Sequence, residues 1–233
     1  MKLALIGYGR MGKTIERIAK ERGHTIVYIA KGGVLDLSQA KLADVAIEFT
    51  QPDAAAQNIY NLLNAGIPVV SGTTGWLDAK SMADAAASSN NIGFVYASNF
   101  SLGVNLFFAF NEKLARIMKG YAEYEPSIHE IHHTGKKDEP SGTAIAAAEG
   151  VLKAYPSLER WTMDPESKGL KISADRKDPY FGTHTVSYDS TLDTIELKHE
   201  AHSRDGFALG AVLAAEWVPG RKGPFSMKDV LGL

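Results

Sequence analysis

The sequence contains no cysteine among its 233 residues. This absence excludes disulfide bonds, thiolate nucleophiles and zinc or iron–sulfur sites built on cysteine. It also suits a reducing compartment, and we expect a cytoplasmic protein.

Strong net charge and long apolar runs are missing as well. The chain has 25 Lys and Arg residues against 27 Asp and Glu residues, which gives a formal net charge of −2. Nucleic acids and membrane surfaces attract basic patches, so this balance argues against both as partners. Only a short apolar run precedes Gly7, too short for a secretory signal, and no later run approaches the roughly 20 residues of a membrane span.

The first hundred residues alternate short apolar segments with helical patterns. Strands separated by helices of this length are typical of crossovers in a parallel sheet with helices on both faces, so we predict an α/β fold. The expected strands are residues 2–6, 25–30, 45–49, 67–71 and 92–97. The expected helices run from the turn at 7–12 to about residue 22, from 52 to 65 and from 78 to 88.

After Asn99 the pattern changes. A long helix is predicted at 102–118, and its aromatic residues Phe107, Phe108 and Phe110 are expected in the core. A strand at 127–133, a loop with two lysines and a helix at about 143–155 follow. Three strands without intervening helices, at 170–174, 183–187 and 194–199, are typical of an antiparallel or mixed sheet. We expect a final helix at 207–217, a short tail, and two domains in all.

A glycine-rich turn follows the first predicted strand. It fits the pattern G-x-G-x-x-G with Gly7, Tyr8, Gly9, Arg10, Met11 and Gly12. Such glycines permit a tight turn, close approach of a pyrophosphate, and close packing of helix on strand. The following helix N-terminus offers free N–H groups to phosphates. The turn predicts a site for NADH or NADPH, and a glycine turn that binds nothing is the alternative.

The acid that should bind the ribose after the second strand is missing. Ala30, Lys31, Gly32 and Gly33 stand there instead. Lys31 could meet a 2′-phosphate, which would favour NADPH, or be a solvated loop lysine. The choice between NADH and NADPH therefore stays open.

Two further loops follow strands of the predicted sheet. Gly72, Thr73 and Thr74 follow the fourth strand, and Ser98, Asn99, Phe100 and Ser101 follow the fifth. The carboxyl edge of an open α/β sheet is where ligands bind, so both loops are candidates for the nicotinamide ribose. Ordinary turn chemistry is the alternative, because these residue types dominate turns.

The densest chemistry lies between residues 130 and 144. His132 and His133 can transfer protons near neutral pH, and Lys136 can neutralise a carboxylate or donate a proton. Ser141 is a good N-cap, which leaves the N–H groups of Gly142 and Thr143 for an anion. The segment predicts a site for a substrate that carries carboxylates.

This segment closely resembles the signature of the dihydrodipicolinate reductase family. The shared residues are Glu130, His132, His133, Lys136, Asp138, Pro140, Ser141, Gly142, Thr143 and Ala144. The resemblance also covers the glycine turn and the segments 72–74, 99–105 and 203–208. It implies NAD(P)H-dependent reduction of a cyclic dicarboxylate, 4-hydroxy-tetrahydrodipicolinate, in the diaminopimelate route to lysine.

The resemblance also implies roles for residues. His132 would be the acid–base residue, Lys136 the proton donor, and His133, Gly142 and Thr143 the ligands of the substrate carboxylates. The glycine turn, 72–74 and 98–101 would contact the dinucleotide. Which of His132 and Lys136 delivers the proton stays open.

The family fold implies two domains and a homotetramer. Residues 1–101 and 206–233 would form a Rossmann-like dinucleotide-binding domain. Residues 102–205 would form a central α+β mixed-sheet domain for substrate binding and tetramerisation.

A metal site is the main alternative, but His132 and His133 point to opposite faces of a strand and no H-E-x-x-H pair occurs, so no metal is predicted. His184, His199 and His202 are expected at the surface or hydrogen-bonded in strands, although His199 and His202 could still meet substrate. A different dinucleotide oxidoreductase and a non-catalytic NAD(P) sensor remain as rival functions.

Overall fold

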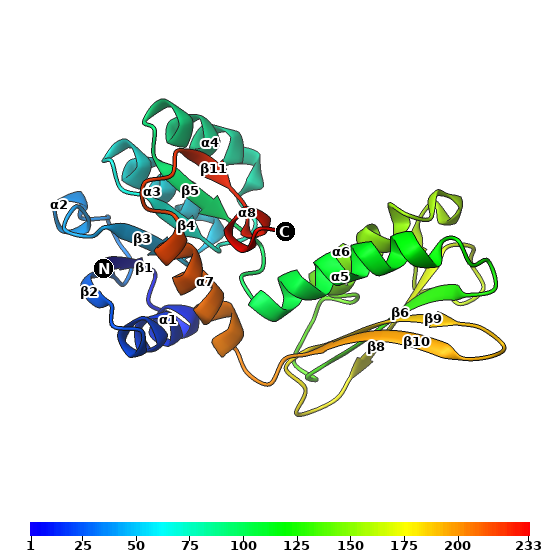
Figure 1. Ribbon diagram of the computed structural model, residues 1–233. Coiled ribbons are helices and arrows are strands. Elements are labelled where there is room, and N and C mark those ends of the chain that lie inside the picture. Colours follow the sequence, from blue (N-terminus) through cyan, green and yellow to red (C-terminus); the bar gives the residue numbers. More distant parts are fainter. The chain divides into compact units, whose positions relative to one another are not determined.

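The computed structural model describes all 233 residues and divides the chain into two compact units. Unit 1 comprises Met1–Leu102 and Arg204–Leu233, and unit 2 comprises Gly103–Ser203. Each unit has its own sheet and its own hydrophobic core (Figure 1).

Unit 1 is built on a six-stranded parallel sheet with the order β11-β5-β4-β3-β1-β2. Its strands are β1 (Lys2–Ile6), β2 (Thr25–Ala30), β3 (Val45–Glu48), β4 (Val69–Ser71), β5 (Gly93–Tyr96) and β11 (Gly223–Phe225). The chain passes from β1 to β2 on one side and then returns to β3 on the other side of β1. This reversal leaves a crevice at the carboxyl ends of β1 and β3, where open α/β proteins bind ligands.

Helices cover both faces of this sheet. One face carries α1 (Arg10–Glu21), α7 (Asp205–Trp217) and α8 (Met227–Leu231). The other carries α2 (Leu37–Ala40), α3 (Pro52–Asn64), α4 (Lys80–Ser89) and the 3₁₀ turn η1 (Leu77–Ala79). Side chains alternate along a strand, so Leu3 and Leu5 of β1 join the first core and Ala4 and Ile6 join the second. The predicted Rossmann-like parallel sheet is confirmed.

The end of the chain is more ordered than the sequence suggested. Instead of a short tail, Gly223–Phe225 forms the edge strand β11, parallel to β5. Helix α8 follows, with a capping box between Ser226 and Asp229. The expectation of a tail was wrong because a three-residue strand is too short to show a period, and Pro224 is tolerated only because the strand lies at the edge.

Unit 2 contains a five-stranded mixed sheet with the order β10-β9-β6-β8-β7. Its strands are β6 (Glu125–His132), β7 (Trp161–Thr162), β8 (Leu170–Arg176), β9 (Thr183–Asp189) and β10 (Thr194–Glu200). β6 pairs parallel with β8 and antiparallel with β9, so the predicted mixed sheet is confirmed. The helices α5 (Leu102–Met118) and α6 (Gly142–Leu152) pack on one face of it (Figure 1), and the 3₁₀ turn η2 (Pro156–Leu158) follows α6.

Helix α5 presents a different face to the core than its aromatic residues suggested. Phe107 is buried at 3% exposure, but Phe110 is 56% exposed, so its assignment to the core was wrong. The inward positions include Asn111 and Ala115, and Asn111 Nδ2 donates to the carbonyl oxygen of Ala147 on α6 at 2.8 Å. Close packing against the alanine-rich face of α6 therefore favours small residues and turns Phe110 outward.

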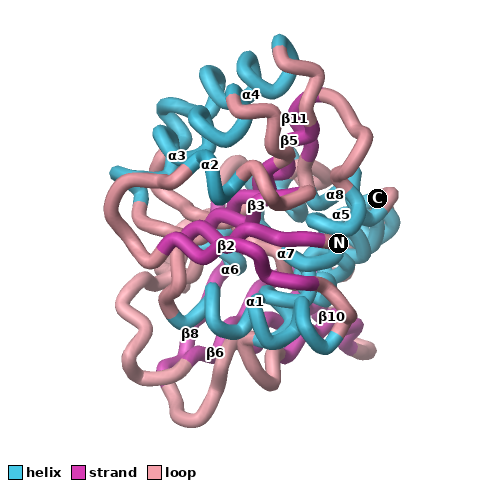
Figure 2. Tube along the Cα trace, turned by 90° about the vertical axis from the view of Figure 1, so that its left-hand side faces the viewer, coloured by secondary structure: helices cyan, strands magenta, loops and turns pink.

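Figure 2 shows the strands of unit 1 with α3 and α4 on one side and α1 on the other. None of the helices combines the length and the apolar character that a membrane span needs.

Candidate active site

The glycine turn lies at the crevice of the unit 1 sheet. Gly7 directly follows β1, and its φ of 95° lies in the left-handed region that favours glycine. A Cβ atom at this position would lie 1.9 Å from the carbonyl oxygen of Phe49, which follows β3. The close approach of the two strand ends therefore requires glycine here. Gly12 lies inside α1, against the carbonyl oxygen of Gly7.

The N-terminus of α1 is open to an anion. Its N-cap is Gly9, no side chain caps it, and its first turn contains no acidic residue. The unpaired N–H groups and the positive end of the helix dipole can therefore hold a pyrophosphate.

A pocket of about 770 Å³ includes this turn, within the size range of ligand sites. It is lined by Gly7, Tyr8, Gly9, Arg10, Met11, Lys31, Gly32, Phe49, Thr50, Gln51, Pro52, Gly72, Thr73 and Thr74. The structure thus brings the glycine turn, Lys31 and the 72–74 loop together, and a chain of backbone and hydroxyl donors fits a dinucleotide.

The other predicted cofactor residues do not line this pocket. Gly12 packs within α1, and Ser98, Asn99, Phe100 and Ser101 are absent from the lining. Phe100 is 2% exposed, and its ring centroid lies 5.8 Å from that of Phe49, so its side chain belongs to the core of unit 1. The contact of Gly12 and of residues 98–101 with the dinucleotide stays a prediction.

Lys31 stands at the β2 end of the pocket. Its Nζ lies 5.3 Å from the centroid of the Tyr8 ring, a cation–π contact. The Tyr8 hydroxyl in turn donates to Glu16, whose pKa is lowered by its hydrogen bonds with Lys20 and Tyr8. Lys31 is therefore anchored beside the glycine turn, in a position that suits a 2′-phosphate as well as simple packing on Tyr8.

Sequence reasoning missed Glu48, the last residue of β3. Its side chain is 0% exposed, and its carboxylate accepts hydrogen bonds from Thr50 N at 2.9 Å, Thr73 Oγ1 at 2.8 Å and Ser71 Oγ at 2.6 Å. Thr50 and Thr73 both line the pocket, so Glu48 ties together the two loops that follow β3 and β4. The sequence signal was a carboxylate at the end of an otherwise apolar strand. A charged side chain is buried only where hydrogen-bond donors satisfy it.

The basic loop of unit 2 connects β6 to α6. His132 ends β6 and is 7% exposed, and Lys136 Nζ lies 2.8 Å from both carboxylate oxygens of Asp138. Burial, with a smaller contribution from the charge of Lys136, lowers the pKa of His132 to about 4, against the pull of Glu130. His132 and Lys136 therefore lie four residues apart, at the end of β6 and in the loop that follows it.

The N-terminus of α6 closes this loop. Ser141 is the N-cap, and its Oγ accepts a hydrogen bond from Ala144 N at 3.2 Å. Gly142 and Thr143 form the first turn, which contains no acidic residue. Their N–H groups have no partner within the helix, so they can bind a carboxylate. His133 lies at the other end of the loop, where a Cβ on Gly135 would meet its Nδ1 at 3.2 Å.

A buried cluster supports the loop from the sheet side. Glu130, His132 and His184 place one potential ligand atom each within 4.8 Å of one another. The guanidinium of Arg176 lies 3.1 Å from Glu130, where it compensates the carboxylate charge and would repel a divalent cation. We therefore interpret the cluster as a hydrogen-bonded site, and the absence of a metal stays a prediction.

The remaining histidines differ in their surroundings. His184 of β9 is buried, and its Nε2 lies 3.1 Å from Ser141 Oγ, so this hydrogen-bonded strand residue also belongs to the site. His199 packs beside Phe107, with ring centroids 6.1 Å apart, and burial lowers its pKa. His202 is exposed and lines a separate pocket with Phe181. A contact of His199 or His202 with substrate stays a prediction.

A protein that can hold a dinucleotide in one unit and offer a proton to an anionic substrate in the other is an NAD(P)H-dependent reductase. Comparison with known proteins identifies the kind of reductase. A family profile described as dihydrodipicolinate reductase, N-terminus, matches residues 1–100, and one described as dihydrodipicolinate reductase, C-terminus, matches residues 103–231. The chain belongs to the dihydrodipicolinate reductase family.

Two relatives named 4-hydroxy-tetrahydrodipicolinate reductase support this assignment. The protein of Christiangramia forsetii is 49% identical over 234 residues, which cover 99% of this chain and 98% of its own. The protein of Methanococcoides burtonii is 35% identical over 256 residues, which cover 96% of each chain. The predicted family is confirmed, and with it an oxidoreductase of lysine biosynthesis that uses NADH or NADPH.

Solved structures show the same fold. A dipicolinate-bound dihydrodipicolinate reductase from Paenisporosarcina sp. TG-14 matches with a TM-score of 0.79 and 20% identity over 97% of both chains. An amine dehydrogenase from Mycobacterium smegmatis matches with a TM-score of 0.62 and 11% identity over 97% of this chain and 95% of its own. The Rossmann-like unit with an attached mixed-sheet unit is therefore a shared architecture.

Proposed function

We propose that the chain reduces (2S,4S)-4-hydroxy-2,3,4,5-tetrahydrodipicolinate with residues of both units. The strongest support is the basic loop, in which His132, Lys136 and the N-terminus of α6 occur within one segment. Loss of the 4-hydroxyl group as water gives the substrate ring one additional double bond, and addition of a hydride and a proton across one double bond then gives tetrahydrodipicolinate. A bound nicotinamide dinucleotide would supply the hydride but no proton. The protein must therefore deliver the proton to the adjacent atom, and this loop has the groups to do so.

The charge states favour Lys136 as the proton donor. Because the pKa of His132 is lowered to about 4, its imidazole is neutral near pH 7. Lys136 instead carries a proton in its ion pair with Asp138. When substrate carboxylates enter the loop, Lys136 exchanges Asp138 for the substrate and donates from Nζ. A positioned general acid contributes about 10²–10⁴-fold to the rate.

The other residues of the loop hold the substrate. The N–H groups of Gly142 and Thr143 bind one carboxylate at the start of α6, and His133 binds at the opposite end of the loop. His132 acts as the acid–base residue, whose neutral imidazole hydrogen-bonds the reacting group. The two bound carboxylates fix the orientation of the substrate ring, so the proton donor faces a single ring atom.

Residues of unit 1 hold the dinucleotide. The pyrophosphate binds the turn Gly7–Gly12 at the start of α1, and the loops at Thr50 and 72–74 lie along the rest of the pocket. Lys31 meets the 2′-phosphate when NADPH is bound, which leaves both cofactors as candidates.

The reaction is tested by the loss of reduced-nicotinamide absorbance. Substrate is made in situ by the preceding synthase from pyruvate and aspartate semialdehyde, and parallel assays contain NADH or NADPH. We expect oxidation that depends on every component, and the ratio of the two rates gives the cofactor preference. Folded protein that oxidises neither cofactor would contradict the proposed substrate.

We also propose a cytoplasmic homotetramer that forms through unit 2. Both helices of unit 2 pack on one face of its sheet, so the opposite face, which carries Ser127, His129 and Ile131, lacks a helical layer of its own. Light scattering during size-exclusion chromatography should give about four times the chain mass of 25.2 kDa. The mass of one chain would contradict the tetramer.

A further inference from the structure

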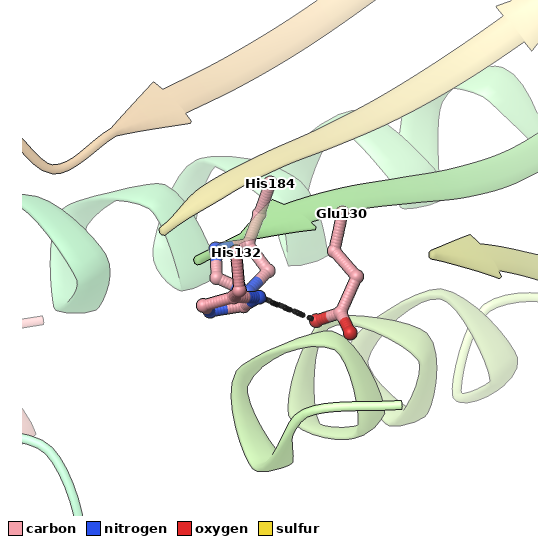
Figure 3. Close-up of side chains that lie close together, drawn as sticks. All are labelled: Glu130, His132 and His184. Carbon is pink, nitrogen blue, oxygen red and sulfur yellow. Dashed lines mark ion pairs between the residues drawn. The ribbon is translucent and has the colours of Figure 1, made fainter. Parts of the chain in front are cut away.

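A buried carboxylate lies directly behind the proposed acid–base residue. Glu130 precedes His132 by two residues on β6, so both side chains point to the same face of the sheet. Glu130 is 0% exposed, and His184 of the neighbouring strand β9 faces the same space. Figure 3 shows the three side chains pointing toward one another.

The two oxygens of Glu130 have different partners. Oε1 accepts hydrogen bonds from Ser141 N at 3.0 Å and from Arg176 Nη2 at 3.1 Å. Oε2 lies 3.5 Å from His132 Nδ1 and 3.5 Å from His184 Nε2. One oxygen thus holds the start of α6 and a cation, while the other is directed at the imidazoles.

The carboxylate also reaches the loop through Arg176. Besides Glu130, Arg176 Nη2 donates to the carbonyl oxygen of Asp138 at 2.7 Å, and Asp138 is the ion-pair partner of Lys136. The loop is therefore fixed at Asp138 and at Ser141, and both attachments lead to Glu130.

The two ring nitrogens of His132 are in different surroundings. Nδ1 is buried, has no closer hydrogen-bond partner, and faces Glu130 Oε2, whose other neighbour is His184 Nε2. Nε2 lies on the Gly182 side, where a Cβ atom would come within 3.0 Å of it. Gly182 has a φ of 154°, and its missing side chain leaves room beside this nitrogen. Catalytic hydrogen bonds are often long without substrate and tighten when it binds.

We propose that Glu130 is a positioning residue of the reduction site: it accepts the Nδ1 proton of His132, so that Nε2 faces the reacting group, and it holds the loop and α6 through Arg176 and Ser141. This inference rests on the proposed function, because it assigns the role of Glu130 in that same reaction.

Charged and titratable groups face His132 from several elements. They are Glu130 on its own strand, His184 on β9, Arg176 on β8 and Lys136 in the loop. Of these, only Glu130 favours the imidazolium, whereas the other three and burial oppose it. Hydrogen bonds from His184 and Ser141 outweigh the effect of burial on Glu130 and lower its pKa to about 2, so the carboxylate keeps its charge across the pH range of an assay.

Glu130→Gln keeps the size of the side chain and removes its charge. We expect kcat to fall about 10²-fold while the Kd of NADH changes by less than about twofold. The limb of the kcat–pH profile that belongs to His132 should move to lower pH, because loss of a negative neighbour lowers an imidazole pKa. Glu130→Asp keeps the charge, so it should retain the wild-type limb with a smaller loss of kcat.

Glu149→Gln is the matched control, since Glu149 is an exposed carboxylate on α6 away from the site. It should behave as wild type. Wild-type kcat and an unmoved pH profile in Glu130→Gln would overturn the inference. If Glu130 had a purely structural role, its substitution would instead lower the melting temperature and change all kinetic parameters. The His132 limb of the kcat–pH profile would then stay unchanged in both Glu130 variants.

A measurement on the unsubstituted protein does not depend on the folding of any variant. Nitrogen-15 NMR of histidine-labelled protein at pH 7 should show His132 with its proton on Nδ1, assigned by the signal that His132→Gln loses. A proton on Nε2 would overturn the inference. If the wild type fails to oxidise either cofactor, the proposed function falls, while the tautomer still tests the contact between Glu130 and His132.

Discussion

The two units each bury one carboxylate completely, and they surround it differently. Glu48 of unit 1 accepts hydrogen bonds from one backbone N–H and from the hydroxyl groups of serine and threonine. Glu130 of unit 2 faces a guanidinium, a backbone N–H and two imidazoles. The first carboxylate meets only neutral donors, and the second meets a cation and two groups that titrate.

This difference matches the tasks we propose for the units. Neutral donors that do not titrate near pH 7 fix the shape of a binding pocket over a wide pH range. A carboxylate among imidazoles and cations controls where protons reside, as acid–base chemistry requires. We therefore expect variants of unit 1 to change cofactor affinity and variants of unit 2 to change turnover and pH dependence.

The largest effect is expected for Lys136→Ala. Removal of the proton donor should lower kcat by about 10²-fold or more, while the Kd of NADH stays the same, because Lys136 belongs to unit 2. Steady-state kinetics and a fluorescence titration with NADH measure the two quantities. Lys137→Ala, the neighbouring lysine, is the control. Unchanged turnover would remove Lys136 from the mechanism.

The second-largest effect is expected in the pH dependence of the free energy of unfolding. Burial lowers the pKa of His132 from 6.5 to about 4 in the folded protein, so the unfolded chain takes up a proton at a higher pH than the folded one. Stability should therefore fall as the pH drops from about 6.5 towards 4, by about 2 kcal/mol between pH 7 and pH 5.

Urea unfolding at pH 7, 6 and 5 measures this loss, with His132→Gln as the control that lacks the group. Glu130, whose folded pKa is about 2 against an ordinary 4.5, contributes stability that is lost only at lower pH. Equal pH dependence in wild type and His132→Gln would show that His132 is not held neutral.

A smaller effect is expected for Glu48→Gln. The amide accepts fewer hydrogen bonds than the carboxylate, so Thr50 and Thr73 are held less firmly at the pocket. We expect the Kd of NADH to rise about 10-fold with kcat at saturation changed by less than about twofold. Glu21→Gln, an exposed carboxylate on α1, is the control. A loss of kcat with unchanged Kd would break the proposed division between the units.

The smallest effect is expected for Lys31→Ala. If Lys31 meets a 2′-phosphate, the KM of NADPH should rise by about threefold to tenfold and that of NADH should stay the same. Equal KM values for both cofactors in variant and wild type would identify Lys31 as a lysine that only packs on Tyr8.

Much of the fold could be predicted because its signals are local. The strands at Lys2–Ile6 and Thr25–Ala30 and the helix Leu102–Met118 were predicted with the bounds that the structure has. The short strand Gly223–Phe225 was missed, since three residues at a sheet edge show no period. Phe110 was wrongly assigned to the core. Periodicity predicts which face of a helix is apolar, but it does not show which part of that face a neighbouring helix covers.

The candidate site was predictable to the extent that it is contiguous in sequence. The glycine turn and the basic loop are single segments, and the resemblance to the family depends on them. Glu48 and His184 were not identified, because their partners are distant in sequence: Thr73 for Glu48, and Glu130 and Ser141 for His184.

The sequence by itself determined the family, the α/β class and the segments that carry the chemistry, because each depends on residues close together along the chain. Only the tertiary structure decided which atoms face one another. It placed Glu130 between His132 and Arg176, and it joined Thr50 to Thr73 through Glu48. The physical reason is that strand pairing brings together residues far apart in sequence, and a buried charge is stable only beside the partners that pairing supplies.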